Sequence, residues 1–269
     1  MRINTNVNAM YATNNMNKNA ALSGNSMQKL ASGLRINKAS DDAAGLAVSE
    51  KMRAQIRGME QADRNVQDGI SLIQTAEGAL GEAGDIAQRM RELAVQGAND
   101  TLSATDRAKV KTELDQLGKE MMNIAEETKF NGNKLLEGTT AKFTIQAGAT
   151  DEIREIDMVN LKDIADTVKN LTVDSNANAK TSITTIDTAL ENINTARATL
   201  GAQQNRLEAT SSNLTTSIEN MTEAESRIRD VNIASEMTNL AKLNLLTQTS
   251  QAMVAQAKSQ PDGIVQLLR

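Results

Sequence analysis

The stretch Ile183–Ile228 (ITTIDTALENINTARATLGAQQNRLEATSSNLTTSIENMTEAESRI) decides the fold class of this chain. Its apolar residues recur at alternating steps of three and four, the heptad spacing of a helix that packs against partner helices. The segment has no proline, and Gly201 is its only glycine. At about 1.5 Å per residue, such a helix is roughly 70 Å long. The predicted seam positions are Ile183, Ile186, Leu190, Ile193, Arg197, Leu200, Gln204, Leu207, Ser211, Leu214, Ile218, Met221, Glu225 and Ile228.

Two upstream segments supply the partner helices that this stripe needs. A long apolar pattern covers residues 52–90, and Asp41 or Asp42 is the expected N-cap of its helix. A short carboxylate suits that position because it accepts the free amide hydrogens of a first turn. A second helix is expected from about residue 105 to 124, with Ser103 at its start.

Residues 130–180 have a different pattern. Asn131-Gly132 is a turn signal, and Phe143 and Ile145 alternate with polar residues, which indicates one or two short hairpins. Asp174–Lys180 is expected to be a polar loop. The predicted fold is therefore predominantly all-α, a long antiparallel helical bundle or coiled coil with a small β-hairpin region.

The two ends of the chain carry weaker helical patterns, with Asn, Gln, Ser and Thr between the apolar residues. Helices of this kind are marginal alone. We therefore expect the ends to pack with each other or with neighbouring chains.

Composition excludes several kinds of function. The chain of 269 residues has no His or Cys, and aromatic residues make up 1% of it. Ser-His-Asp triads, Cys nucleophiles, zinc fingers and His-ligated haem all require the missing residues. Asp41 and Asp42 are adjacent, so on a helix their side chains would diverge, and no phosphate-binding Gly loop is present. We expect a protein that is not an enzyme and has no cofactor or metal.

Neither nucleic acid nor a membrane is an expected partner. The net charge is −5, without a dense Lys/Arg run or tandem aromatics for base stacking. No stretch approaches the ~18 apolar residues of a membrane helix. Residues 1–15 have no apolar core of a secretory signal, so we expect no cleaved signal peptide.

Two blocks of the sequence resemble a known family. Leu30–Leu80 (LASGLRINKASDDAAGLAVSEKMRAQIRGMEQADRNVQDGISLIQTAEGAL) is similar to the N-terminal signature of bacterial flagellin. Arg227–Ala257 (RIRDVNIASEMTNLAKLNLLTQTSQAMVAQA) is similar to its C-terminal signature, and Phe130-Asn131-Gly132 resembles the turn after its second helix. The likeness covers nearly the whole chain and implies a short form without the large variable outer domains.

The resemblance implies a structural subunit of the extracellular flagellar filament. It implies a terminal domain of residues 1–40 and 236–269 in the inner filament core, and a long-helix domain of residues 41–235 outside it, with Arg35–Gly45 between the layers. The implied partners are further copies of the chain, cap and hook–filament junction proteins, an export chaperone and the flagellar secretion apparatus. A hook–filament junction protein is the alternative.

Assembly is expected to use apolar side chains at both ends, which order when a subunit adds to the growing tip. The residues predicted to make these contacts are Ile3, Val7, Met10, Leu245, Leu246, Val254, Ile264, Leu267 and Leu268. The alternative is that they form an intramolecular core.

Gln88–Gln96 (QRMRELAVQ) resembles the flagellin motif recognised by Toll-like receptor 5. By that resemblance, Arg89, Leu93 and Glu113 would form the receptor contact. Arg89 and Leu93 are four residues apart and share a helix face. An Arg next to a Leu on an amphipathic helix is also an ordinary edge of a core stripe, so both interpretations stay open.

Overall fold

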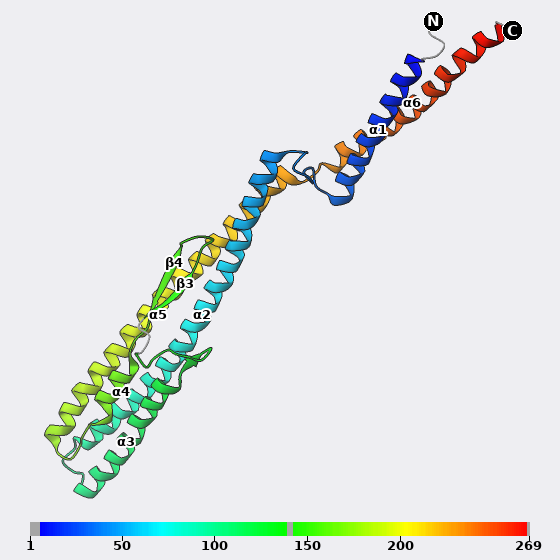
Figure 1. The fold of residues 1–269 in the computed structure, drawn as a ribbon. Helices are drawn as coiled ribbons and strands as arrows, with labels where there is room; N and C mark the ends of the chain where they lie inside the picture. Colours follow the sequence, from blue (N-terminus) through cyan, green and yellow to red (C-terminus); the bar gives the residue numbers. More distant parts are fainter. Residues whose placement is uncertain (1–5, 139–141, 268–269) are drawn as a thin grey trace. The chain divides into compact units, whose positions relative to one another are not determined.

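The computed structural model describes residues 6–138 and 142–267, with side chains up to Ser259. Within these ranges it consists of long helices and two antiparallel hairpins, which confirms the predicted fold class (Figure 1). The helices are α1 (Val7–Ser32), α2 (Ala43–Gly97), α3 (Ala104–Glu127), α4 (Leu161–Lys169), α5 (Asn176–Arg229) and α6 (Ile233–Leu267). The strands are β1 (Lys129–Phe130), β2 (Asn133–Lys134), β3 (Lys142–Gln146) and β4 (Ile153–Asp157). No helix in the described ranges is long and apolar enough to span a lipid bilayer.

Two helices begin at predicted caps. Oδ1 of Asp42 accepts the Gly45 amide at 2.9 Å, at the start of α2. Oγ of Ser103 accepts the Asp106 amide at 3.2 Å, at the start of α3. Of the two candidates before α2, therefore, Asp42 is the cap.

Helix α4 is absent from the sequence prediction. It has 9 residues, which is below the length at which an isolated helix is stable in water. Packing on α3 supports it, since a Cβ added to Gly118 would lie 3.1 Å from the Cα of Lys169. Such a close approach comes from tertiary structure, which local sequence does not reveal.

The polar loop expected at Asp174–Lys180 is shorter than predicted, because α5 already begins at Asn176. Oγ of Ser175 accepts the Asn178 amide at 3.2 Å. Ser, Asn and Asp favour loops and helix N-termini for the same reason, their short hydrogen-bonding side chains. The composition of this segment therefore did not distinguish a loop from a first helical turn.

The chain forms two compact units, which we describe separately. The first contains residues 1–54 and 220–269, and the second contains residues 55–219. This division concerns compactness within one chain. The domain division implied by the resemblance, at residues 40/41 and 235/236, concerns layers of an assembly and stays a prediction.

In the second unit, one of the two seam positions predicted for each heptad is buried and the other is not. Every seventh residue from Ile186 to Leu214 is buried, as expected: Ile186, Ile193, Leu200, Leu207 and Leu214. The second buried position of each heptad lies one residue earlier than predicted, at Ala189, Ala196 and Gln203 instead of Leu190, Arg197 and Gln204. Alanine at a contact lets neighbouring backbones approach closely. The heptad pattern of large apolar residues did not predict that small residues would be buried there.

Glycines of α2 face this core at two points. A Cβ on Gly84 would lie 3.8 Å from Ile193 of α5, and a Cβ on Gly69 would lie 3.2 Å from Ile145 of β3. The β3–β4 hairpin therefore packs on α2 through its apolar face, with Phe143 opposite Ile156 in the register.

The β1–β2 hairpin confirms the predicted turn at Asn131-Gly132. Both residues have positive φ, 49° and 84°, and they connect the paired residues Phe130 and Asn133. A two-residue turn with positive φ at both positions matches the twist of the flanking strands, which explains the Asn-Gly pair.

The corrected seam makes a prediction about stability. Ile193→Ala should lower the free energy of unfolding by about 2–5 kcal/mol, because it opens a cavity in a packed core. The sequence pattern had assigned Arg197 to the core. Arg197→Ala should change the free energy of unfolding by at most about 1 kcal/mol, because the side chain is 44% exposed and its ion pair with Glu77 is long at 4.0 Å. Urea unfolding followed by circular dichroism measures both, and equal effects would contradict the corrected seam.

Candidate self-assembly surface

Helices α1 and α6 lie side by side and run antiparallel (Figure 1). Oγ of Ser23 donates to Oδ1 of Asn244 at 2.9 Å, and Nδ2 of Asn239 donates to Oγ of Ser26 at 3.3 Å. Ser23 and Ser26 are buried, with 6% and 4% of their surface exposed. Hydroxyl and amide groups thus occupy the contact where most helix pairs bury leucine, and they fix the register of the two helices.

The outer end of this pair is held by one asparagine. Oδ1 of Asn6 caps α1 by accepting the Ala9 amide at 3.0 Å, and its Nδ2 donates to the Ala257 carbonyl at 2.6 Å. One side chain therefore both starts α1 and joins it to α6.

The large apolar side chains of this pair mostly face away from the contact. Leu243 is buried, but ten others are exposed. On α1 they are Val7, Met10, Tyr11, Leu22 and Met27, and on α6 they are Ile233, Met237, Leu245, Leu246 and Met253. So many exposed large apolar side chains on one helix pair indicate an interaction site, and complete burial of each such side chain contributes about 1.5–3 kcal/mol.

The structure places the predicted assembly residues as follows. Val7, Met10, Leu245 and Leu246 are exposed, at 38%, 54%, 64% and 39%, and Val254 is half-buried. Ile3 and Leu268 lie outside the described residues, and the side chains of Ile264 and Leu267 are outside them as well.

Six of the exposed residues were not among those predicted: Tyr11, Leu22, Met27, Ile233, Met237 and Met253. The spacing of Val7, Met10 and Tyr11 by three and four residues could have indicated the first of them. On α6 the apolar residues surround the helix rather than forming one stripe, so no single periodicity identified the others.

A groove of ≈ 380 Å³ opens along this pair. Tyr11, Leu246 and Met253 supply its apolar lining, and Asn8, Asn15 and Ser250 lie among them. Apolar groups with a few amides and hydroxyls suit a protein segment better than a small charged ligand.

The loop after α1 is tied to the end of α5. Gly33 ends α1 with a φ of 72°, and its carbonyl accepts the Val231 amide at 3.0 Å. The Arg35 amide donates to the Arg229 carbonyl at 2.6 Å, and the Arg35 guanidinium donates to the Ile228 carbonyl. The segment that the resemblance places between two layers is therefore held by backbone hydrogen bonds.

Ion pairs support the same region. The Arg229 side chain is 10% exposed and pairs with Glu50. Nε of Arg53 lies 3.0 Å from Oε1 of Glu225. A buried guanidinium needs such a partner, because an unpaired buried charge is strongly destabilising.

In the second unit, Arg89 of α2 and Glu113 of α3 form a surface ion pair. Nη2 of Arg89 lies 2.9 Å from Oε1 of Glu113, and Nη1 lies 3.0 Å from Oε2 of Glu92. The hydrogen bond with Glu113, then that with Glu92, raises the pKa of Arg89. Leu93 is 2% exposed. The structure thus presents Arg89 and Glu113 together at the surface and places Leu93 in the core beneath them.

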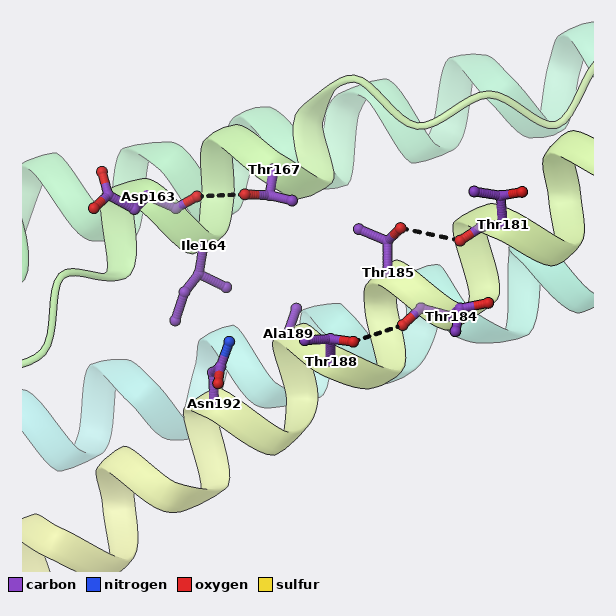
Figure 2. A pocket seen from close by; sticks show the side chains of 9 residues that line it. All are labelled: Asp163, Ile164, Thr167, Thr181, Thr184, Thr185, Thr188, Ala189 and Asn192. Carbon is purple, nitrogen blue, oxygen red and sulfur yellow. Dashed lines mark hydrogen bonds between the residues drawn. The ribbon is translucent and has the colours of Figure 1, made fainter.

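A second groove, of ≈ 400 Å³, lies between α4 and α5 (Figure 2). Its threonines donate to carbonyls one turn earlier: Thr167 to Asp163 at 2.7 Å, and Thr188 to Thr184 at 3.0 Å. These hydroxyls donate to backbone carbonyls, whereas an activated nucleophile donates to a side-chain base. Within the described residues, no three His, Cys, Asp or Glu side chains form a group that could hold a metal ion.

Long packed helices and a terminal helix pair with outward apolar side chains define a helical structural protein. Its family follows from comparison. Residues 3–141 match the bacterial flagellin N-terminal helical region, and residues 183–268 match the bacterial flagellin C-terminal helical region. The chain belongs to the bacterial flagellin family.

Two flagellins match this chain over the full length of both sequences. It is 51% identical over 272 residues to a flagellin of Halalkalibacterium halodurans and 46% identical over 304 residues to a flagellin of Bacillus subtilis, with 100% of both chains covered in each case. The crystal structure of Bacillus cereus flagellin is 39% identical, with a TM-score of 0.52, over 60% of this chain and 94% of that one.

The loop between α1 and α2 should respond to acid. The backbone amides of Lys38 and Asn37 donate to the Asp41 carboxylate and lower its pKa from the ordinary 3.8. Because the folded pKa is the lower one, this contact stabilises the loop fully above pH 3.8 and is lost as the pH falls through the folded value.

Hydrogen-exchange protection of the Asn37 and Lys38 amides, measured by NMR against pH, checks this. Protection should fall on acidification in the wild type. Asp41→Ala, which removes both acceptor oxygens, should show low protection at every pH. Protection that is the same in both proteins would mean that the carboxylate does not hold the loop.

Proposed function

We propose that this chain is the subunit of the extracellular bacterial flagellar filament and that it polymerises through the outward apolar side chains of α1 and α6. One observation carries the proposal: buried serines bonded to asparagines form part of the α1–α6 contact, while ten large apolar side chains of the same pair are exposed. A single chain leaves this surface uncovered, and further copies of the chain supply what covers it.

The arrangement favours open-ended growth. A head-to-tail contact between unlike surfaces forms a ring only if the rotation between neighbouring subunits closes the circle. If it does not, repeated addition gives a helical polymer. Because ten large apolar side chains of α1 and α6 are exposed in a single chain, we expect neighbouring subunits to supply much of their stability. Ordering on addition offsets part of the contact energy, which limits polymerisation away from the growing tip.

The proposal has consequences for partners and chemistry. The chain acts as structural material and not as a catalyst. Its further partners are the cap and hook–filament junction proteins, an export chaperone and the flagellar secretion apparatus, which delivers it without a cleaved signal peptide. A role as the junction protein itself is less favoured, because the flagellins of Halalkalibacterium halodurans and Bacillus subtilis match the chain from end to end.

Assembly by salt precipitation tests the proposed surface. Sulfate strengthens burial of apolar groups, so the wild type should form long filaments visible by negative-stain electron microscopy. Met10→Ser combined with Leu245→Ser should raise the critical concentration about tenfold or more, since each removed side chain contributes roughly 1.5–3 kcal/mol when fully buried. Gln248→Ser, which changes an exposed polar residue of the same helix, is the matched control.

Both altered side chains are exposed in the single chain, so the circular dichroism of the monomer should not change. An unchanged critical concentration in the double variant would contradict the assignment of these residues. Attachment of the wild type to hook ends without filament growth would favour the junction-protein alternative.

A second proposal concerns recognition by Toll-like receptor 5. We propose that Arg89 and Glu113 form the exposed contact and that Leu93, packed beneath them, holds the Arg89 turn of α2 in place. The favouring observation is the surface pair between Arg89 and Glu113 at 2.9 Å, which presents a donor and an acceptor in a fixed geometry.

Arg89→Ala with Glu113→Ala should leave filament formation intact and reduce receptor signalling by the dissociated monomer. A reporter cell line that expresses the receptor measures the signal. Lys109→Ala with Asp106→Ala removes another exposed pair of the second unit and is the control. Equal signalling by the wild type and the Arg89/Glu113 variant would contradict the proposal.

A further inference from the structure

All the sulfur chemistry of this chain resides in methionine. The sequence contains 13 Met and no Cys, and it also lacks His and Trp. Cysteine and methionine are the side chains that two-electron oxidants attack at sulfur. In this chain, therefore, only the thioethers are available to such oxidants.

The methionines that are exposed in the described residues all lie on one pair of helices. Met10, Met27, Met237 and Met253 are 54%, 56%, 53% and 59% exposed, and all four lie on α1 or α6. The methionines of the second unit that pack in its core are buried: Met59, Met90 and Met121. Among the described residues, those methionines most open to an oxidant are therefore the ones on the terminal helix pair.

At least one of the four lines the groove of α1 and α6 described above. Met253 lines it together with Tyr11 and Leu246. Conversion of a thioether to a sulfoxide replaces a flexible apolar group with a polar one, which disrupts apolar interfaces. A sulfoxide at this position would therefore place a strong hydrogen-bond acceptor where a neighbouring subunit needs an apolar contact.

We propose that Met10, Met27, Met237 and Met253 form an oxidative modification site that blocks assembly, with hydrogen peroxide or another hydroperoxide as the substrate. In the reaction, a sulfur lone pair attacks the terminal peroxide oxygen, the O–O bond breaks and an S–O bond forms. The proton of the transferred OH passes to the departing oxygen, which leaves as water from hydrogen peroxide or as an alcohol from an organic hydroperoxide. Sulfur is oxidised by two electrons and the peroxide is reduced by two. The effect on assembly rests on the proposed function, whereas the oxidation itself does not.

The site discriminates between two states of the protein. In a single chain the four thioethers are open to solvent, and in a polymer built through α1 and α6 neighbouring subunits cover them. Oxidation therefore acts on subunits that have not yet been incorporated and spares those within a filament. It is also reversible, because methionine sulfoxide reductases return the sulfoxide to the thioether at the expense of two thiols.

Peptide mass spectrometry after graded hydrogen peroxide treatment tests the site directly. In the monomer, Met10, Met27, Met237 and Met253 should each gain one oxygen atom before Met59, Met90 and Met121 do. In filaments, the same four should no longer be oxidised before the three core methionines. Oxidation of the three core methionines first, or at the same rate, would overturn the proposal whether or not the protein polymerises.

Assembly of treated protein tests the consequence. The readout is the filament yield after peroxide divided by the yield of the same variant before it, so differences in untreated assembly cancel. Peroxide should greatly reduce this ratio in the wild type and much less in a variant with all four residues changed to Leu. Met90→Leu with Met121→Leu is the matched control and should lose assembly as the wild type does.

Reduction supplies an independent measurement. Treatment of the oxidised wild type with both epimer-specific sulfoxide reductases and a dithiol should restore filament formation. No restoration, or equal peroxide sensitivity in the four-Leu variant, would overturn the effect on assembly. If untreated wild type forms no filaments, the proposed function fails, and the order of oxidation in the monomer still decides the modification site.

Discussion

The polar contact between α1 and α6 is the constraint on which the rest of this structure depends. Two buried serines accept or donate hydrogen bonds across the pair, and an asparagine at one end joins α1 to the α6 backbone. These bonds specify register and direction, and contribute less apolar burial than a leucine seam would. The large apolar side chains are thereby free to face outward, and in our proposal the next subunit covers them.

The second unit has the opposite design. Its helices bury a continuous row of aliphatic side chains, with alanine and glycine where the backbones come closest. It needs no partner to cover its core. The chain thus combines a unit that buries its own core with a helix pair whose large apolar side chains are mostly exposed.

The sequence predicted the elements with strong periodic signals. The helix through Ile193 and Leu200, the caps at Asp42 and Ser103 and the turn at Asn131-Gly132 all have local causes, namely apolar spacing, capping chemistry and positive φ. It failed where tertiary contact decides. Ala189 and Gln203 are buried by tertiary contacts, and Gln203 donates to Asp157 of β4, although Leu190 and Gln204 fit a simple heptad equally well.

The candidate surface was only partly predictable for the same reason. Val7, Met10, Leu245 and Leu246 were chosen as apolar residues at the chain ends, but sequence alone does not say whether such residues face inward. That answer depends on Ser23 and Ser26 occupying the contact, which follows from the pairing of segments more than 200 residues apart in the chain. Leu93 illustrates the converse, because a residue chosen for a surface role lies in the core.

Carbene footprinting of the monomer and of filaments grown from it tests the central claim most directly, since carbenes label exposed apolar side chains without regard to charge. The account predicts that Val7, Met10, Leu245 and Leu246 are labelled in the monomer and become protected in the filament. Equal labelling of these four residues in both states would contradict it, because assembly would then leave the outward faces of α1 and α6 uncovered.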